Sequence, residues 1–280
     1  SEDGFCASFE SFAYHKLGYH DAYELGPKEI VALTSNGYET VSPAGTEMKI
    51  CGFLWTYYGY PNSNYEGKNV EVMRYRNGEV MAREEVRNGT LPDVDYVAGV
   101  PDSGLDAALV YAKAFGLPCG IGFTKNKYIG RTFISPTQEQ REVGVNIKLN
   151  PIRSLVEGKR IVLIDDSIVR GTQLKETTEF LYQSGAKEVH IRPACPPLLF
   201  GCKYLNFSRS SSEMELITRR IIQQREGEVT EEKLQEYANP DSQCYNEMVE
   251  EIRKQLNFTT LRYHRLDDMI KAIGLPACKL

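Results

Sequence analysis

The stretch that decides the fold runs from residue 160 to residue 172 and reads Arg-Ile-Val-Leu-Ile-Asp-Asp-Ser-Ile-Val-Arg-Gly-Thr. Its apolar part, Ile161 to Ile164, shows no alternation, which is typical of a strand buried on both faces of a parallel sheet. The apolar run ends at Asp165 and Asp166, where such a strand reaches the carboxyl edge of its sheet, and ligands of open α/β sheets bind at that edge. The sequence therefore predicts an α/β fold with a binding site directly after this strand.

The turn that follows the two acids has the composition of a phosphate-binding loop. Residues 167–172 supply hydroxyl groups, a flexible Gly171 and backbone N–H groups that converge where the next helix begins, near Gln173. An anion at that point meets unpaired donors and the positive end of the helix dipole. Carboxylates repel phosphate, so Asp165 and Asp166 are expected to face ribose hydroxyls, positive charge developing on the sugar, or Mg²⁺.

A strand that ends in two acids has a structural alternative, a buried strand followed by a solvated acidic turn. The complete run from Arg160 to Thr172 favours a binding site over this structural alternative, because it closely resembles the phosphoribosyl pyrophosphate (PRPP) motif of type I phosphoribosyltransferases. Its ending, from Asp165 onwards, most resembles the glutamine PRPP amidotransferases of purine synthesis. The resemblance implies a type I phosphoribosyltransferase fold with a mainly parallel sheet.

The same resemblance divides the chain into three parts. Residues 1–50 resemble the last β part of an N-terminal-nucleophile glutaminase domain, residues 51–200 the phosphoribosyltransferase domain, and residues 201–280 a C-terminal helical extension. Asn36-Gly37 is a hairpin signal between two short strands of the first part. The glutaminase nucleophile of the family is a cysteine at the mature N-terminus, and Ser1 lies far downstream of its place. We expect the chain to be a fragment that begins late in that domain.

A second polar turn, Pro101-Asp102-Ser103-Gly104, follows the predicted strand Tyr96 to Val100 and precedes the predicted helix Leu105 to Phe115. A strand, a tight polar turn and a helix form an anion-receiving edge, although a plain connection has the same pattern. In the resembled family this turn is the pyrophosphate loop. The resemblance implies pyrophosphate binding by Asp102, Ser103 and Gly104, and Mg²⁺ binding by Ser103 with Asp165 and Asp166.

A long polar segment without clear periodicity begins at Lys125 and reaches about Asn150. Such a segment inside a compact α/β domain is a lid or a solvated basic loop. Its cations favour a lid, because they would offset the charge of a leaving pyrophosphate while closure excludes water. The residues from Lys125 to Ile134 resemble the start of the family's catalytic flexible loop, which implies leaving-group neutralisation by Lys125 and Arg131.

The resemblance implies an amidophosphoribosyltransferase activity, which forms 5-phosphoribosylamine and pyrophosphate from PRPP and glutamine-derived ammonia. Asp165, Asp166, Lys125 and Arg131 are then the catalytic residues. The 5-phosphate is assigned to the turn made of Ser167, Ile168, Val169, Arg170, Gly171 and Thr172. By the same resemblance we expect a homotetramer that purine nucleotides inhibit. Two alternatives stay open: a salvage phosphoribosyltransferase that attaches a nucleobase, and a non-catalytic regulator that senses PRPP.

The composition argues against nucleic acid and membranes as binding partners. A formal charge of −5, from 33 basic and 38 acidic residues, provides no basic field for nucleic acid. No apolar run approaches the roughly 18 residues of a membrane span. Seven scattered cysteines and the lack of a secretory signal indicate a reducing cytosol, so we expect a cytoplasmic protein.

Two cysteines stand out by resemblance alone. Cys51 and Cys202 match two ligands of a structural [4Fe-4S] cluster that one amidotransferase subfamily carries. The remaining close pair would begin at about the end of this sequence, and Cys278 alone cannot replace it. We therefore expect a cluster in the full-length protein only. The cysteine- and tryptophan-containing segment from Cys51 to Ser63 by itself predicts a buried strand with aromatic packing.

Overall fold

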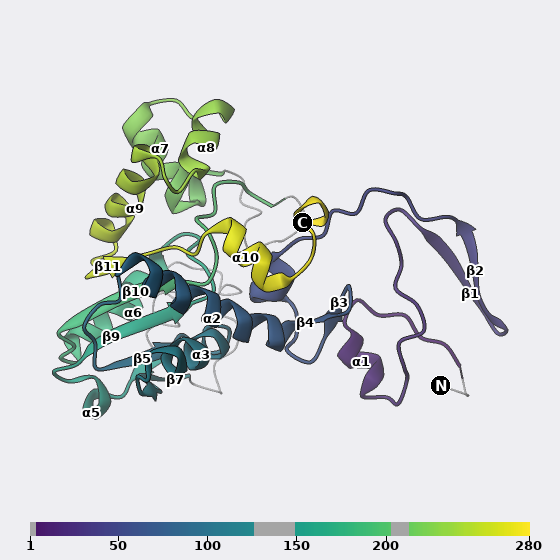
Figure 1. Ribbon diagram of the computed structural model, residues 1–280, viewed down its shortest axis with the longest axis horizontal. Helices are drawn as coiled ribbons and strands as arrows, with labels where there is room; N and C mark the ends of the chain where they lie inside the picture. The colour runs from purple at the N-terminus through teal and green to yellow at the C-terminus, as the bar shows by residue number, and fades with distance from the viewer. Residues whose placement is uncertain (1–3, 126–148, 203–212) are drawn as a thin grey trace, which may run out of the picture. The chain divides into compact units, whose positions relative to one another are not determined.

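The computed structural model describes residues 4–125, 149–202 and 213–280, and Figure 1 labels its helices and strands. The chain divides into two compact units. The first unit combines residues 1–77 with 267–280, and the second contains residues 78–266. The boundary falls inside helix α2 (Val70–Asn88). These units are groups of residues in contact, and the predicted domains 1–50, 51–200 and 201–280 stay predictions.

The first unit holds the predicted hairpin. Strands β1 (Ile30–Thr34) and β2 (Gly37–Ser42) pair antiparallel, with Thr34 opposite Gly37, so the turn contains only Ser35 and Asn36. The other elements of this unit are α1 (Ser11–His15), η1 (Leu54–Tyr58), β3 (Asn64–Tyr65), β4 (Lys68–Asn69), most of α10 (Leu266–Ile273) and η4 (Ala277–Lys279). The hairpin is confirmed, whereas its origin in a glutaminase domain stays a prediction.

The strand predicted within Cys51 to Ser63 is wrong, because the chain forms a π-helical turn at η1. The backbone N–H of Gly59 donates to the carbonyl of Leu54 at 2.7 Å, a spacing of five residues. Arg74 satisfies neighbouring carbonyls in place of a second strand: its Nε donates to Trp55 O at 3.0 Å and its Nη2 to Gly59 O at 3.1 Å. The predicted burial of Trp55 is confirmed, since its side chain is fully enclosed.

The second unit is built on a five-stranded sheet in the order β11-β10-β9-β5-β6, and every neighbouring pair is parallel. In chain order the strands are β5 (Tyr96–Gly99), β6 (Cys119–Gly120), β9 (Arg160–Asp165), β10 (Glu188–Pro193) and β11 (Thr260–Leu261). The apolar run of the opening motif is the central strand, β9. The predicted α/β class is confirmed. After β6 the chain forms β7 (Phe123–Lys125), which lies outside this sheet and pairs antiparallel with β8 (Leu149–Pro151).

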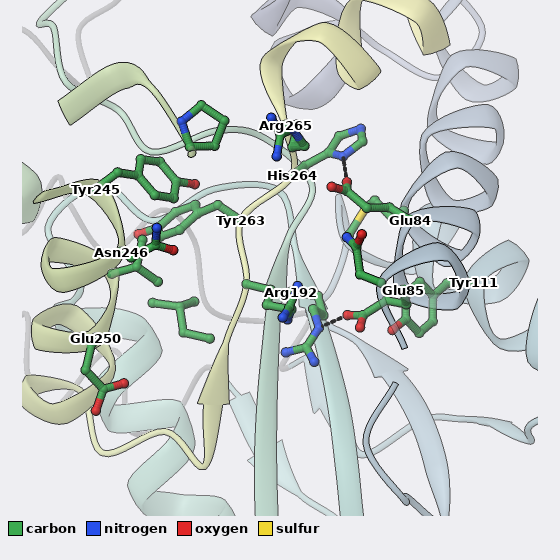
Figure 2. Close-up of a pocket in the computed structure, with 16 residues that line it drawn as sticks. Glu84, Glu85, Tyr111, Arg192, Tyr245, Asn246, Glu250, Tyr263, His264 and Arg265 are labelled. Carbon is green, nitrogen blue, oxygen red and sulfur yellow. Dashed lines mark hydrogen bonds and ion pairs between the residues drawn. The ribbon is translucent and has the colours of Figure 1, made fainter. Parts of the chain in front are cut away.

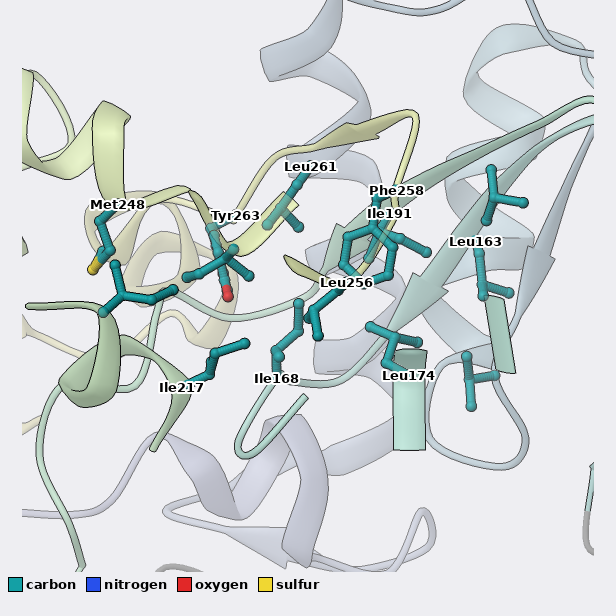
Figure 3. Packing of buried hydrophobic residues seen from close by; sticks show 14 of the residues in the cluster. Leu163, Ile168, Leu174, Ile191, Ile217, Met248, Leu256, Phe258, Leu261 and Tyr263 are labelled. Carbon is teal, nitrogen blue, oxygen red and sulfur yellow. The ribbon is translucent and has the colours of Figure 1, made fainter. Parts of the chain in front are cut away.

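Side chains of β9 alternate between two cores. Val162 and Ile164 pack with residues of α2 and α3 (Leu105–Phe115), whereas Ile161 and Leu163 face the larger core. Figure 3 shows part of the larger core, where Leu163 and Ile191 from the sheet lie near Leu174. The helices on that side are α5 (Arg153–Val156), α6 (Thr172–Gln183), α7 (Ile217–Glu226), α8 (Glu231–Ala238) and α9 (Gln243–Gln255), with the short η3 (Glu213–Glu215) before α7. Burial on both faces explains the unbroken apolar sequence.

Helices α2 and α3 approach each other closely at Gly78. A Cβ atom on Gly78 would lie 2.3 Å from the carbonyl oxygen of Ala107, so only glycine allows this contact. The contact turns α3 so that Ala107 and Tyr111 are buried, while Leu105 and Leu109 are exposed. None of the helices in the described ranges is long and apolar enough to cross a membrane.

Candidate active site at the carboxyl edge of the sheet

The two acids of the opening motif lie at the carboxyl end of β9 and contact the second polar turn. Asp166 is only 8% exposed, and its carboxylate accepts hydrogen bonds from the hydroxyls of Ser103 and Ser167, the latter at 2.6 Å. The backbone N–H of Asp166 donates to the Asp165 carboxylate at 2.9 Å. The structure thus brings together residues that are more than 60 positions apart in the sequence.

Two glycines allow the turn after β5 to lie against the end of β9. The backbone N–H of Val100 donates to Ile164 O at 2.8 Å, which continues the pairing of β5 with β9. A Cβ atom on Gly104 would lie 2.3 Å from that same carbonyl oxygen, and one on Gly99 would lie 2.6 Å from Gly104 O. Both positions require the absence of a side chain because backbone atoms fill the space. This close packing holds Ser103 next to Asp166.

The paired carboxylates favour a cation. Burial, and then the neighbouring charge of Asp166, raises the pKa of Asp165 well above its ordinary value. Ionising both groups together is therefore costly without positive charge nearby. Mg²⁺ is commonly bound by one or two carboxylates together with water and substrate phosphates. The donor set of Asp165, Asp166 and Ser103 fits that pattern, although no three His, Cys, Asp or Glu side chains in the described residues gather as a complete metal cage.

The turn after the acids presents backbone donors. Gly171 has a positive φ of 82° and caps α6, and its carbonyl accepts the Lys175 N–H at 2.9 Å. Within the described ranges, the N–H groups of Arg170, Gly171 and Thr172 have no acceptor. These groups lie at the N-terminus of a 12-residue helix, where backbone donors and the helix dipole favour an anion.

The side chains of the turn differ in burial and in their partners. Ile168 is 2% exposed and belongs to the larger core, so it can offer a ligand only its backbone. Val169 is partly buried, and Arg170 forms an ion pair with Glu215. The Ser167 hydroxyl is the side-chain donor nearest the acids. The turn therefore presents backbone N–H groups, and its Ser167 hydroxyl donates to Asp166.

Residues 74–195 match the family described as "Phosphoribosyl transferase domain", a range that contains both turns and both acids. These residues belong to the phosphoribosyltransferase family. Ser103 and Asp166, which contact each other, therefore both lie within the phosphoribosyltransferase domain.

Similarity extends beyond this domain. The chain is 36% identical to the amidophosphoribosyltransferase of Methanothermobacter thermautotrophicus over 95% of its own length and 49% of the relative. It is 34% identical to the Bacillus subtilis amidophosphoribosyltransferase, with coverages of 97% and 50%. These relatives confirm the resemblance seen in the sequence. The chain spans about half the length of the curated relatives it matches.

Solved structures agree with the sequence relatives. A structure described as the allosteric regulatory enzyme of purine biosynthesis superposes with a TM-score of 0.75 and 32% identity, over 96% of this chain and 52% of the other. The glutamine PRPP amidotransferase of B. subtilis, solved in complex with ADP and GMP, gives a TM-score of 0.73 and 33% identity, over 95% and 51%. This chain therefore shares its fold with the matching part of both solved structures.

Four further predicted residues are Lys125, Arg131, Cys51 and Cys202. Arg131 lies outside the described residues, and Lys125 is the last residue of β7, where its backbone pairs with Leu149. Cys51 is exposed in the first unit, and Cys202 is partly exposed in the second.

In the first unit, the backbone N–H of Ile50 donates to Lys279 O at 2.8 Å and Lys49 Nζ donates to Cys278 O at 3.0 Å. The segments that carry Cys51 and Cys278 therefore lie side by side.

A buried polar cluster in the phosphoribosyltransferase domain was not predicted. Arg192 of β10 is 2% exposed and forms an ion pair with Glu85 of α2, which is 4% exposed (Figure 2). Arg192 Nη1 also donates to Thr260 Oγ1 at 3.0 Å. A cavity of about 290 Å³ adjoins the pair, and Tyr111 and His264 line it. The signal in the sequence is the polar alternation of Glu188, His190 and Arg192 along β10, a strand whose other face is apolar.

Proposed function

We propose that the phosphoribosyltransferase domain forms 5-phosphoribosylamine and pyrophosphate from PRPP and ammonia, the transferase half of the amidophosphoribosyltransferase reaction. The observation that carries this proposal is the contact between Ser103 and Asp166 beside a turn whose backbone donors have no acceptor among the residues that the structure describes. One edge of the sheet thereby offers a place for each part of PRPP. The sequence relatives support the same reaction class.

The roles of these residues follow from the charges that develop in the transition state of the transfer reaction. The bond between ribose C1 and pyrophosphate breaks with both electrons leaving on oxygen, so the sugar becomes oxocarbenium-like in the transition state. Asp165 and Asp166 place negative charge near this cation, and the turn of residues 167–172 holds the 5-phosphate. The lone pair of ammonia forms the new bond to C1, and a proton then passes to solvent. Mg²⁺, held by Asp165, Asp166 and Ser103, would neutralise part of the pyrophosphate charge.

The remaining roles are proposals from the sequence. Lys125 and Arg131 would neutralise the leaving pyrophosphate, and Asp102, Ser103 and Gly104 would contact it. We also propose a cytoplasmic homotetramer that purine nucleotides inhibit, and a [4Fe-4S] cluster in the full-length protein with Cys51 and Cys202 among its ligands. The B. subtilis relative was solved with ADP and GMP, which supports nucleotide binding in this group of proteins.

Pyrophosphate release from PRPP with Mg²⁺ tests the proposal. The protein is assayed with ammonium at alkaline pH, with glutamine, and with purine bases as acceptors. We expect ammonium-dependent release, and the glutamine arm shows whether this chain supplies its own ammonia. The double variant Asp165→Asn/Asp166→Asn should lose about two orders of magnitude in turnover, while its thermal midpoint stays within a few degrees. Transfer to a purine base would indicate a salvage enzyme, and PRPP binding without turnover would indicate a sensor.

A further inference from the structure

Helix α7 holds the phosphate-binding turn from the side opposite the proposed ligand. The carbonyl oxygen of Val169 accepts the backbone N–H of Ile217 at 2.9 Å. The next carbonyl oxygen, that of Arg170, accepts Nη2 of Arg220 at 2.8 Å. Two consecutive carbonyls of the turn are therefore fixed by residues one helical turn apart in α7.

Fixing these carbonyls also fixes the next two N–H groups. In a planar trans peptide the C=O bond of one residue and the N–H bond of the following residue point in opposite directions. When the carbonyl of Val169 points to Ile217, the N–H of Arg170 must point away from α7. When the carbonyl of Arg170 points to Arg220, the N–H of Gly171 must do the same. Both N–H groups lack an acceptor within the described ranges, as donors awaiting an anion would.

The packing around Gly171 makes this arrangement rigid. A Cβ atom at this position would lie 2.9 Å from Ile217 Cδ1 and 2.9 Å from Leu256 Cδ2. The turn thus rests directly on the apolar surface formed by α7 and the end of α9, where Figure 3 shows Ile168, Ile217 and Leu256 close together. The Arg170 side chain adds an ion pair with Glu215.

Helix α7 is itself anchored, so it can serve as a support. The Thr218 hydroxyl donates to Leu198 O, and Arg219 Nε donates to Leu199 O. Ile221 and Ile222 are fully buried in the larger core. A fixed helix that contacts two carbonyls in a row can therefore set the orientation of the turn.

We propose that Arg220 is a positioning residue for substrate binding: its bond to the Arg170 carbonyl aims the Gly171 N–H at the phosphate. This inference rests on the proposed function, because the phosphate is taken to be the 5-phosphate of PRPP. Arg220 acts through the backbone rather than by touching the ligand.

The test compares Arg220→Ala with Arg220→Lys, which keeps a charged donor, and with the control Gln224→Ala. Gln224 lies on the same helix and is exposed, and within the described ranges no side-chain hydrogen bond joins it to residues 167–172. Calorimetric titration with PRPP and Mg²⁺ gives the Kd, and steady-state assays give separate KM values for PRPP and ammonium. We expect Arg220→Ala to raise the Kd and KM for PRPP about tenfold. The KM for ammonium and the thermal midpoint should stay near wild type, Arg220→Lys should recover part of the loss, and Gln224→Ala should match wild type.

A second probe separates this inference from the proposed function. Inorganic phosphate is titrated while the amide resonances of Arg170 and Gly171 are followed by NMR. We expect phosphate to shift both resonances in the wild type, with a weaker response in Arg220→Ala. If phosphate does so but PRPP neither binds nor reacts, the proposed function fails and the positioning role stands. If Arg220→Ala keeps wild-type affinity for phosphate, or if phosphate leaves both resonances unmoved in the wild type, the positioning role is overturned.

Discussion

Replacing Gly104 by alanine tests whether the turn after β5 must lie against β9 for the site to work. The added Cβ would lie 2.3 Å from Ile164 O and 2.9 Å from Val100 N. Both neighbours are backbone atoms of the sheet edge, so the turn must retreat by about 1 Å to restore an ordinary contact, and a displacement of that size can cost about 10²-fold in rate. Because Ser103 precedes Gly104, the retreat separates its hydroxyl from Asp166. We therefore expect Gly104→Ala to lower turnover about a hundredfold.

The cost in stability should be smaller. Overpacking costs about 1–3 kcal/mol, and reduced freedom of the unfolded chain offsets about 0.4–1 kcal/mol of it. Pyrophosphate release measures turnover, and calorimetry measures the thermal midpoint. The control is Gly122→Ala, where the nearest atoms to the added Cβ are side-chain atoms at 3.4 and 3.5 Å. If Gly104→Ala retained turnover within about threefold of the control, the contact between the turn and β9 would not be needed, and the reasoning from close packing would be refuted.

Two further predictions concern the polar face of β10. Glu85→Ala leaves Arg192 buried without its carboxylate, so the free energy of unfolding measured in urea should fall by about 3–5 kcal/mol. The control Glu79→Ala removes an exposed ion pair with Arg83 on the same helix and should cost under about 1 kcal/mol. Equal losses in the two variants would contradict this view of the buried pair. Burial lowers the pKa of His190, so below the ordinary value of 6.5 the unfolded chain binds more protons than the folded chain. The free energy of unfolding should therefore fall as the pH drops through that range, and His190→Gln should flatten its pH profile between about 7.5 and 5.5. A slope that persists in His190→Gln would assign the pH dependence to another group.

Sequence reasoning succeeded where the information was local. The strand, the acid pair and the polar turn form one contiguous run, so residues 160–172 predicted strand β9 and the place of both acids at its carboxyl end, while ligand binding there stays a prediction. The hairpin before residue 43 was predicted from Asn36-Gly37 for the same reason. In each case neighbouring residues carry the decisive chemistry.

The misses come from contacts between distant segments. The π-helical turn at Leu54 depends on Arg74, which binds its carbonyls from another helix, so the aromatic sequence alone favoured a strand. The close packing of α2 on α3 depends on Gly78, a residue that by itself only weakens a helix, so the local sequence does not reveal this contact. Strand β11 has two residues and exists through its pairing with β10. The partnership of Arg192 with Glu85 likewise joins residues 107 positions apart.

The outer strands of the large sheet are its shortest. Strands β6 and β11 form the two edges and contain two residues each, while the three inner strands contain four to six. An exposed edge is a template on which the backbone of another molecule can add a strand, and short edges are one way in which proteins prevent such addition. The sheet therefore concentrates its long, continuous hydrogen-bonding surface in the interior. That arrangement protects a strongly apolar central strand from recruiting copies of itself into aggregates.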